Sequence, residues 1–273
     1  MAKTTTSEYR NPTAGSELVY QIPGMHKANV RRDVAYTRRA GQPLLMDVYR
    51  PAKAPGGRRL PAVLVGGPPD YSAGKDSGQK VAWSQAIAAS GLAAVAFDIS
   101  SDDFMATPRA PSEDVVAAIA YVRVHADELG VDPDRLCTLG FSFGTAPWHL
   151  WAAMHERVPF VRCNAVWYGP LDLHGLPLSI TRKNADEFSA LTYLRRDKAK
   201  IAPMLVVKAG EDENDGINAS IDRFVRVARQ VRADVTLETA AGAPHGFDLL
   251  NDDARTRDLI EETVAFFRKH LGP

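Results

Sequence analysis

The sequence predicts an α/β fold built on one mostly parallel sheet. From residue 62 onward, short apolar runs of strand length alternate with longer segments of helical periodicity, which is the pattern of a parallel sheet flanked by helices. Ahead of these, two strand-like runs flank a turn and predict an antiparallel N-terminal pair. The chain has 273 residues, 45% of them hydrophobic, which is enough to bury one large core. We therefore expect a single domain over residues 30–273, preceded by an N-terminal arm over residues 1–29.

The predicted elements begin with this arm, whose weak periodicity and turn-forming residues place it on the domain surface. Strands are predicted over 33–37 and 44–49, on either side of the turn Gly41-Gln42-Pro43, and Pro51 ends the second of them. The alternating part then starts with a strand over 62–66, a helix over 80–89, a strand over 92–97, a helix over 112–129, a strand over 135–141 and a helix over 144–158.

The helix over 112–129 has the clearest signature. Ser112 is the expected N-cap, and Glu113 and Asp114 lie near the positive end of the helix dipole. Gly130 follows its last turn. One apolar stripe is formed by Val115, Ile119, Val122, Ala126 and Leu129. We expect this stripe to pack on the sheet.

The alternation continues to the C-terminus. It comprises strands over 163–168, 204–208 and 235–240 and helices over 217–231 and 253–271. The stretch over 169–203 departs most from this rhythm. A segment of this kind above the C-terminal edge of a parallel sheet is a candidate for a small lid.

Residues 140 to 144 read Gly-Phe-Ser-Phe-Gly, and Gly-x-Ser-x-Gly is typical of a sharp turn from strand to helix that exposes the serine hydroxyl. The flanking glycines Gly140 and Gly144 let neighbouring chain approach where a Cβ would collide. Pro147 is comfortable only in a first helical turn, so the helix is expected to begin close to this turn or to be irregular there. Ser142 is the predicted nucleophile.

A serine hydroxyl is a poor nucleophile near neutral pH, so it needs a base and a group that orients the base. His245 follows the strand over 235–240 and has small neighbours that leave its ring accessible. Among the seven histidines, His149 is the main competitor, but it lies about two helical turns beyond Ser142 and should point elsewhere. His245 is therefore the predicted base.

The orienting acid is expected in the loop after the strand over 204–208, where four carboxylates crowd together. Asp212 is preferred because it stands two residues beyond Gly210, directly after the strand. Glu213 is the alternative and would suit a slightly longer loop, whereas Glu211 and Asp215 are expected to be solvated. Each predicted group follows a strand, so all should meet at the sheet edge where ligands bind open α/β folds.

Acyl transfer also needs donors aimed at the developing oxyanion. One is expected to be the backbone N–H of Phe143, the residue after the nucleophile. The other should come from the loop Gly66-Gly67-Pro68-Pro69, in which the prolines cannot donate. Gly67 is therefore the predicted second donor, with an ordinary Gly-Pro turn as the alternative interpretation.

Charge disfavours several classes of partner. Thirty-three basic residues balance thirty-three acidic ones, so no long-range attraction favours nucleic acid. No apolar run approaches membrane-spanning length, and the polar first twelve residues lack the apolar core of a secretory signal. We expect a cytoplasmic protein that binds neither nucleic acid nor membrane and requires no metal and no cofactor. Homo-oligomerisation is left open.

The two cysteines, Cys137 and Cys163, both lie in apolar strand-like runs. A free thiol there usually behaves as a small core residue, so we expect both to be reduced and inert. A disulfide between neighbouring strands is the open alternative.

With these residues placed, the chain resembles the α/β-hydrolase superfamily, and within it the dienelactone hydrolases and acetyl-esterase-like carboxylesterases. The resemblance rests on four stretches that occur in the expected order. The first is Leu45-Met46-Asp47-Val48-Tyr49-Arg50-Pro51, and the second is Ala120-Tyr121-Val122-Arg123 with Gly130-Val131-Asp132-Pro133-Asp134-Arg135. The third is the pentapeptide around Ser142, and the fourth is Pro244-His245-Gly246-Phe247. The resemblance implies helices on both faces of the sheet. The chain departs from the pattern in having Gly66-Gly67-Pro68 where many such esterases carry His-Gly-Gly, and serine where dienelactone hydrolases use cysteine.

The predicted function is that of a serine hydrolase. Ser142 attacks a carboxylic ester, His245 moves the proton, Asp212 orients His245, and an acyl-enzyme is hydrolysed by water. The absence of a large cap insertion favours small acyl groups. The alternatives are a catalytically silent binding protein of the same fold and an acyltransferase or peptidase with the same triad.

Overall fold

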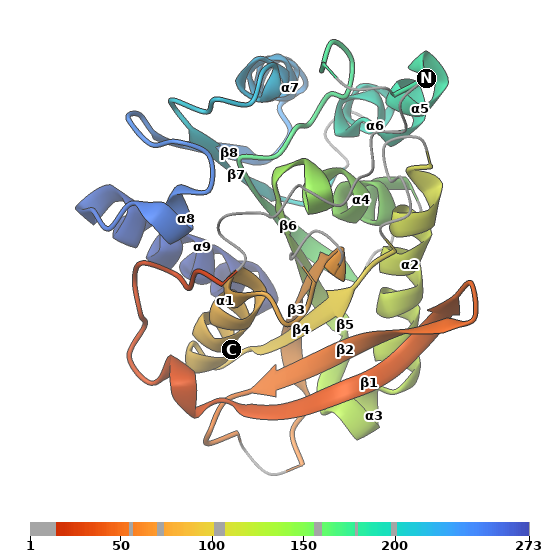
Figure 1. Ribbon diagram of the computed structural model, residues 1–273, viewed down its shortest axis with the longest axis vertical. Coiled ribbons are helices and arrows are strands. Elements are labelled where there is room, and N and C mark those ends of the chain that lie inside the picture. Colours follow the sequence, from red (N-terminus) through yellow and green to blue (C-terminus); the bar gives the residue numbers. More distant parts are fainter. Residues whose placement is uncertain are drawn as a thin grey trace, which may run out of the picture.

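The protein contains one eight-stranded sheet (Figure 1). The computed structural model describes residues 15–54, 57–69, 74–100, 107–155, 160–177, 180–197 and 201–272. The strand order is β1-β2-β4-β3-β5-β6-β7-β8. The strands are β1 (Asn29–Arg39), β2 (Gln42–Arg50), β3 (Leu60–Gly67), β4 (Ala93–Asp98), β5 (Val131–Phe141), β6 (Val161–Trp167), β7 (Met204–Ala209) and β8 (Val235–Ala240). β2 runs antiparallel to both of its neighbours, and the strands from β4 to β8 are parallel. The predicted antiparallel N-terminal pair and parallel sheet are confirmed.

Helices cover both faces of this sheet, as predicted. The described helices are η2 (Met25–Lys27), α1 (Gly78–Ala89), α2 (Arg109–Val124), α3 (Ala126–Leu129), α4 (Ser142–His155), α5 (Arg182–Phe188), α6 (Ala190–Asp197), α7 (Ile217–Val231), α8 (Phe247–Leu250) and α9 (Ala254–Leu271). In Figure 1, α1 and α9 lie on one side of the strands, and α2, α4 and α7 lie on the other.

The strand periodicity explains why two separate cores form. In β3, Ala62 and Leu64 point into the core beneath α2, α4 and α7, whereas Val63 and Val65 point into the core beneath α1 and α9. All four side chains are fully buried. A strand buried on both faces is apolar throughout, as expected in a parallel sheet. The C-terminal ends of the parallel strands are therefore held between two packed layers of helices.

The helix predicted over 112–129 is longer at its start and is divided near its end. It begins at Arg109, and Ser112 lies inside it, where its hydroxyl donates to the carbonyl of Pro108 at 2.8 Å, so the predicted serine cap is wrong. Pro111 fits because the first helical N–H groups have no intrahelical acceptor. The helix breaks at His125, and the short α3 then ends at Gly130, whose φ of +65° is left-handed. All five members of the predicted apolar stripe are buried.

Residues 15–28 pack against the face that α1 and α9 cover. Leu18 and Met25 are buried there, and the backbone N–H of Val19 donates to the carbonyl of Asp248 at 2.9 Å. Tyr20 donates to Glu261 of α9. The described part of the predicted arm therefore contacts the helices that follow the end of the sheet, and residues 1–14 lie outside the described residues.

Cys137 and Cys163 form a disulfide, which corrects the prediction of free thiols. They are paired directly across β5 and β6, with their Cα atoms 4.8 Å apart, and both are fully buried. The one-residue shift in register between Leu136 and Cys137 brings the two cysteines opposite each other. Strand register is a long-range property, so the two apolar runs alone do not specify this pairing.

The stretch over 169–203 contains two short helices that its sequence pattern did not predict. α5 buries Ala185 and Phe188, and α6 buries Leu191 and Leu194. Both helices pack on α4, and α6 also contacts α7. This stretch is the candidate small lid, and its described part is fixed to the helices of one sheet face. Within the described residues, no helix is both long and apolar enough to span a membrane.

Candidate active site

Ser142 lies at the sharp turn between β5 and α4. It is the first residue of the helix and has a φ of +52°, a left-handed conformation that costs free energy for a residue with a Cβ. This strained geometry is the one expected of the Gly-x-Ser-x-Gly turn. Because α4 starts at Ser142 itself, Pro147 lies in its second turn rather than its first. The helix therefore begins at the turn itself, which is one of the two predicted outcomes, and it lacks one backbone donor at Pro147.

Only one of the two flanking glycines is required for close approach. A Cβ on Gly140 would lie 2.7 Å from the Cα of Ala146 in α4, whereas a Cβ on Gly144 would meet nothing within 4 Å. The expectation of a steric need at both positions is therefore corrected to Gly140 alone. Thr145 fastens the turn, because its hydroxyl accepts from the N–H of Phe141 and donates to the Phe141 carbonyl at 2.8 Å.

The structure brings Ser142, His245 and Asp212 together in one hydrogen-bonded chain. His245 Nε2 lies 2.8 Å from Ser142 Oγ, and His245 Nδ1 lies 2.8 Å from Asp212 Oδ2. Asp212 is an acceptor only, so Nδ1 carries the proton and Nε2 is free to accept the serine proton. The Asp212 side chain is fully buried, while that of His245 is 18% exposed. The imidazole thus meets a buried carboxylate on one side and an accessible hydroxyl on the other.

Asp212 is held as an anion by its hydrogen bonds. Burial by itself raises the pKa of this carboxyl, but the hydrogen bond and charge of His245, together with the hydrogen bonds from Asn214, lower it by more. The backbone and side-chain N–H groups of Asn214 donate to Asp212 Oδ1 at 2.9 and 3.1 Å. The net pKa lies below its ordinary value, so the group is ionised at neutral pH.

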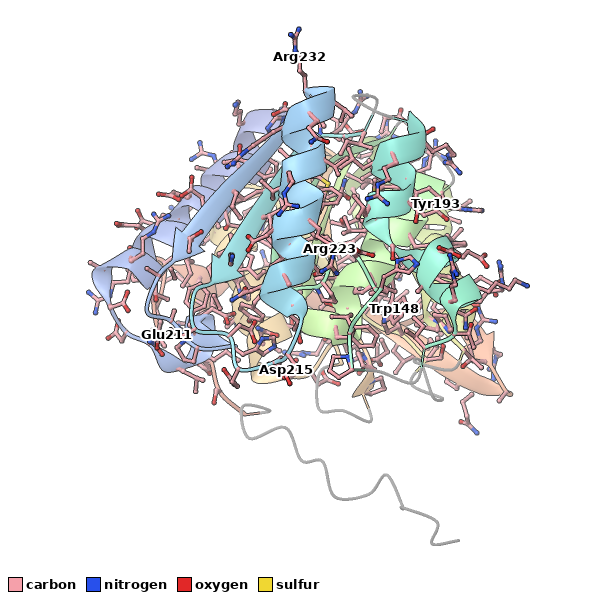
Figure 2. The ribbon with its side chains drawn as sticks, turned by 90° about the horizontal axis from the view of Figure 1, so that it is seen from above. Trp148, Tyr193, Glu211, Asp215, Arg223 and Arg232 are labelled. Carbon is pink, nitrogen blue, oxygen red and sulfur yellow. A yellow bond between two sulfur atoms is a disulfide. The ribbon has the colours of Figure 1, made fainter. Side chains whose placement is uncertain are left out.

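The other carboxylates of this loop are placed differently. Glu213 Oε2 accepts from the backbone N–H of His245 at 3.1 Å, so Glu213 holds the histidine loop rather than the imidazole. Glu211 and Asp215 are exposed, as predicted. Figure 2 shows both of them in the loop at one end of α7, with Arg232 at the opposite end. The sequence pattern gave no signal for the contact of Glu213 with the His245 backbone.

The two predicted oxyanion donors differ in their placement. Phe143 follows Ser142 in the first turn of α4, so its N–H lies beside the nucleophile. Gly67 ends β3, and its carbonyl accepts from the N–H of Ile99 at 3.0 Å. The N–H and C=O of one strand residue point to the same side, so the Gly67 N–H faces β4. This orientation does not aim it at Ser142, and its role as second donor stays a prediction.

His149 instead binds the neighbouring glycine of this loop. Its Nε2 accepts from the N–H of Gly66 at 3.0 Å, and its Nδ1 donates to the carbonyl of Thr145 at 2.9 Å. One nitrogen accepts and the other donates, so the ring is neutral. Burial lowers its pKa to about 4. His149 therefore points away from Ser142, as expected, and ties the end of β3 to α4, which sequence reasoning missed.

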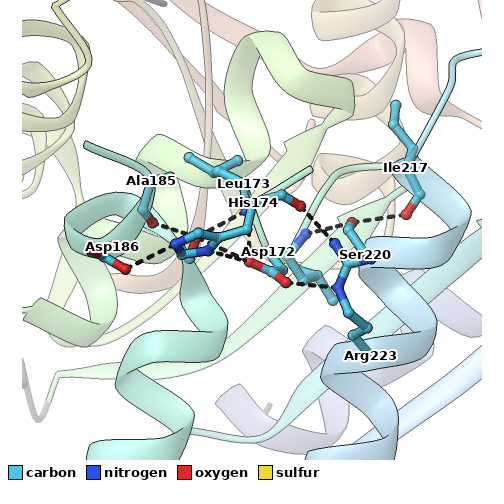
Figure 3. A network of polar contacts seen from close by, with 10 residues as sticks. Asp172, Leu173, His174, Ala185, Asp186, Ile217, Ser220 and Arg223 are labelled. Carbon is cyan, nitrogen blue, oxygen red and sulfur yellow. Dashed lines mark hydrogen bonds and ion pairs between the residues drawn. The ribbon is translucent and has the colours of Figure 1, made fainter. Parts of the chain in front are cut away.

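A polar network around Asp172 fixes the segment after β6 (Figure 3). Asp172 accepts from Arg223 of α7 and from His174, whose other nitrogen lies 2.8 Å from Asp186 of α5. Burial raises the pKa of Asp172, but the hydrogen bonds from Arg223 and His174 lower it by more, so it is ionised. The network joins the loop at the sheet edge to α5 and α7.

Phe143, the residue after the nucleophile, packs against two further aromatic side chains. The Phe143 ring meets Trp148 edge-on, with centroids 5.6 Å apart, and Trp148 meets Phe188 of α5 at 6.2 Å. Such contacts restrict ring motion. Phe143 is therefore supported by α4 and by the short helix of the candidate lid.

No group of three or more histidine, cysteine, aspartate or glutamate side chains suited to a metal ion occurs among the residues that the structure describes. The chemistry of the site must be judged from its serine, imidazole and carboxylate.

Comparisons with known proteins place the chain in a family. Residues 46–187, just over half of the chain, match the BD-FAE family. This match includes Ser142 but ends before Asp212 and His245. No curated protein matches the sequence.

Solved structures share the fold at low sequence identity. Esterase 2 of Thermogutta terrifontis phosphorylated by paraoxon is 21% identical, with a TM-score of 0.67 and coverage of 93% of this chain and 97% of that one. Carboxyl esterase 2 of Tuber melanosporum is 19% identical, with a TM-score of 0.70 and coverage of 98% and 95%. A mutant of the esterase rPPE is 18% identical, with a TM-score of 0.75 and coverage of 93% and 86%. The protein therefore belongs to the BD-FAE family and has the α/β-hydrolase fold.

Proposed function

We propose that this protein is a serine hydrolase that cleaves carboxylic esters through an acyl-enzyme. The observation that carries the proposal is the unbroken relay from Ser142 Oγ through His245 to the buried Asp212, with 2.8 Å at each step. A nucleophile within reach of a base, and a base oriented by a third group, are the parts that nucleophilic catalysis needs.

The reaction follows from the positions of these atoms. His245 Nε2 takes the proton of Ser142 as Oγ bonds to the ester carbonyl carbon, and the carbonyl electrons move to oxygen. We assign the N–H of Phe143, the residue after the nucleophile in α4, as a donor to this oxyanion. When the intermediate collapses, the C–O bond to the alcohol breaks and His245 gives its proton to the leaving alkoxide. Water then repeats the sequence on acyl-Ser142 and releases the acid.

Asp212 makes this proton transfer favourable without taking a proton. Its pKa is lowered, so the carboxylate stays charged and stabilises the imidazolium that forms on His245. It also fixes the proton on Nδ1, which leaves Nε2 as the base.

We propose a small-molecule ester with a small acyl group as the substrate. Phe143 follows the nucleophile in sequence and its ring packs on Trp148, which in turn contacts Phe188, and we propose that this ring limits the room for the acyl group. Two structural relatives support the reaction class by their names, which are a carbohydrate esterase from gut microbiota and the esterase phosphorylated by paraoxon. Neither name identifies the ester used by this protein.

Active-site labelling tests the proposal. The protein is incubated with a fluorophosphonate or with paraoxon, digested, and analysed by mass spectrometry. We expect one adduct, on Ser142, and hydrolysis of a short-chain nitrophenyl ester that disappears with the same time course. An unlabelled Ser142, or equal labelling of the Ser142→Ala variant, would contradict the proposal. A labelled protein that turns over no ester would favour the silent binding alternative.

The compartment and assembly of this enzyme stay predictions. The sequence favours a cytoplasmic protein without nucleic acid or membrane partners, with homo-oligomerisation open. The Cys137–Cys163 disulfide weighs against a cytoplasmic location, because such bonds persist mainly in oxidising compartments. Fractionation of the source cells with rapid thiol alkylation would decide between these locations.

A further inference from the structure

Tyr168 packs directly on the imidazole of His245. It follows β6, and its ring centroid lies 4.6 Å from that of His245, with the ring planes inclined by 60°. Only 2% of the residue is exposed, and its backbone N–H donates to the Val207 carbonyl at 2.7 Å. The ring thus forms a fixed wall on one side of the imidazole.

The backbone conformation of Tyr168 is energetically unfavourable. Tyr168 has a φ of +38°, a region that residues with a Cβ rarely adopt. Such a conformation costs about 1–3 kcal/mol and persists only where the surroundings enforce it. Strained residues of this kind cluster at functional sites, and Ser142 is another at the same sheet edge.

The Tyr168 hydroxyl belongs to a buried polar network. It donates to Asp248 Oδ1 and accepts from Gln79 Nε2 at 2.8 Å. The other oxygen of Asp248 accepts from Gln79 at 2.9 Å and from the indole N–H of Trp83 at 3.0 Å. Asp248 is fully buried, so this carboxylate depends on these donors. The network therefore fixes the Tyr168 ring at its far end.

The same network fixes the chain that carries His245. Asp248 lies three residues after His245 in α8, and Gly246 between them is left-handed, with a φ of +73°. The Asp248 carbonyl also accepts from the N–H of Val19. Tyr168 is thus connected to His245 twice, through the ring contact and through Asp248.

From this double connection we infer that Tyr168 is a positioning residue for His245. Held by Asp248 and Gln79, it keeps the imidazole where Nδ1 meets Asp212 and Nε2 meets Ser142. The inference rests on the proposed function for its catalytic consequence, but the orientation of the imidazole is a property of the resting protein.

Charge supports this arrangement. Burial and the neighbouring Asp248 raise the pKa of Tyr168 well above 10, so its hydroxyl keeps the proton it donates. Three carboxylates face His245 from the elements packed against it. Asp212 accepts from its Nδ1, Glu213 accepts from its backbone N–H, and Asp248 accepts from the hydroxyl of Tyr168, whose ring contacts the imidazole. On the α1 side, Lys80 is fully buried, donates to Gln79, and has a pKa lowered to about 8 by burial.

The test removes the hydroxyl and keeps the ring. In Tyr168→Phe, we expect kcat for a nitrophenyl ester to fall about 10-fold with KM changed less than about twofold, because misplacement of the base affects the chemical step. Labelling of Ser142 by a fluorophosphonate should slow by the same factor. The matched control is Tyr121→Phe, which also removes a tyrosine hydroxyl, but on α2, where the ring stacks on His125. It should leave kcat unchanged.

A second measurement does not depend on turnover. The Nδ1–H proton of His245, bound to Asp212, should give a downfield NMR resonance that is assigned by its loss in His245→Ala. In Tyr168→Phe this resonance should shift and broaden, and in Tyr121→Phe it should not. A role in packing alone, which Tyr168→Phe leaves intact, would not move this resonance.

The outcomes separate the two proposals. If the wild type neither hydrolyses esters nor labels at Ser142, the proposed function fails, and the resonance still decides whether Tyr168 positions His245. A folded Tyr168→Phe variant with an unchanged resonance, or with an unchanged kcat, would overturn the inference. A fall in kcat that only follows the loss of folded protein in a thermal melt would overturn it as well.

Discussion

Asp212 shows what a single side chain contributes to the site. It lies in a loop with three other carboxylates, yet it alone is hydrogen-bonded to the His245 imidazole. Asp212→Asn keeps the size of the side chain but can present an amide donor to Nδ1, which favours the wrong tautomer. We expect kcat to fall by about 10⁴-fold, the loss found when a triad aspartate is replaced by asparagine.

Steady-state kinetics on a nitrophenyl ester check this prediction. Asp215→Asn is the matched control, because Asp215 is an exposed carboxylate of the same loop. Its kcat should equal that of the wild type. A large loss in Glu213→Gln with little loss in Asp212→Asn would assign the orienting role to Glu213 instead.

His149 makes stability depend on pH. Its folded pKa of about 4 lies below the ordinary value of 6.5 because burial disfavours the charged ring. The neutral ring therefore contributes stability that is full above pH 6.5 and is lost as the pH falls toward 4. The full loss is about 3 kcal/mol, since each pKa unit corresponds to about 1.4 kcal/mol.

Urea unfolding at several pH values between 7 and 4.5 measures this contribution. His149→Gln retains an acceptor for the Gly66 N–H but cannot take up a proton, so its free energy of unfolding should fall less steeply with acid. His26→Gln, at an exposed histidine, should keep the wild-type slope. Equal slopes in all three proteins would show that His149 is not buried in its neutral form.

At the scale of elements, the turn between β5 and α4 depends on one close backbone approach. Gly140→Ala would place a Cβ 2.7 Å from the Cα of Ala146, and helix backbone cannot move aside as a flexible side chain would. Relief of the clash must shift α4, which carries Ser142 at its start. We expect a destabilisation of about 2 kcal/mol or more and a loss of at least about 100-fold in kcat.

Gly144→Ala is the matched variant in the same pentapeptide. A Cβ there meets nothing within 4 Å, and the residue is in a helix, where alanine is favoured over glycine. Its stability, measured by thermal melting, should equal or exceed that of the wild type. If the two variants behave alike, the close approach at Gly140 does not define the turn.

The elements that were predictable from sequence are those whose pattern is local. The strands of the parallel sheet and the stripe of α2 follow from apolar periodicity, and Ser142, Asp212 and His245 were found because each follows a strand at its C-terminal end. The start of α2 was placed three residues too late because Ser112 was expected to be the N-cap, whereas Pro111 is accepted in the first turn of the helix. α5 and α6 are short helices whose burial depends on α4 and α7, which a single segment does not reveal.

The same reasoning explains what was missed in the site. Tyr168 and Asp248 are 80 residues apart in sequence and meet because the segments that follow β6 and β8 lie at the same edge of the sheet. His149 and Gly66 are 83 residues apart and meet through the packing of α4. Contacts at such separation follow from the tertiary fold, so no spacing rule could have found them.

At the scale of the whole molecule, the Cys137–Cys163 disulfide joins two central strands across a sequence separation of 26 residues. Closing a loop of this length lowers the entropy of the unfolded chain and stabilises the fold by about 3 kcal/mol. The bonded cysteines are fully buried, so reduction in the native state should be slow. The central sheet is therefore linked covalently beneath the nucleophile.

Guanidinium unfolding checks this contribution. The free energy of unfolding should fall by about 3 kcal/mol when the protein is unfolded and refolded with reductant. The double variant Cys137→Ala/Cys163→Ala should fall further, because it also loses buried sulfur atoms. An equal free energy of unfolding with and without reductant would mean that the thiols are free in solution.

The bond from the Val19 amide to the Asp248 carbonyl gives the beginning of the chain a part in the placement of His245. A fusion partner, an affinity tag or proteolysis that displaces residues near position 19 would break this hydrogen bond and allow α8, which follows His245, to shift. Versions of the protein with different N-terminal tags should then differ in specific activity, even though Val19 is 123 residues from Ser142 in sequence.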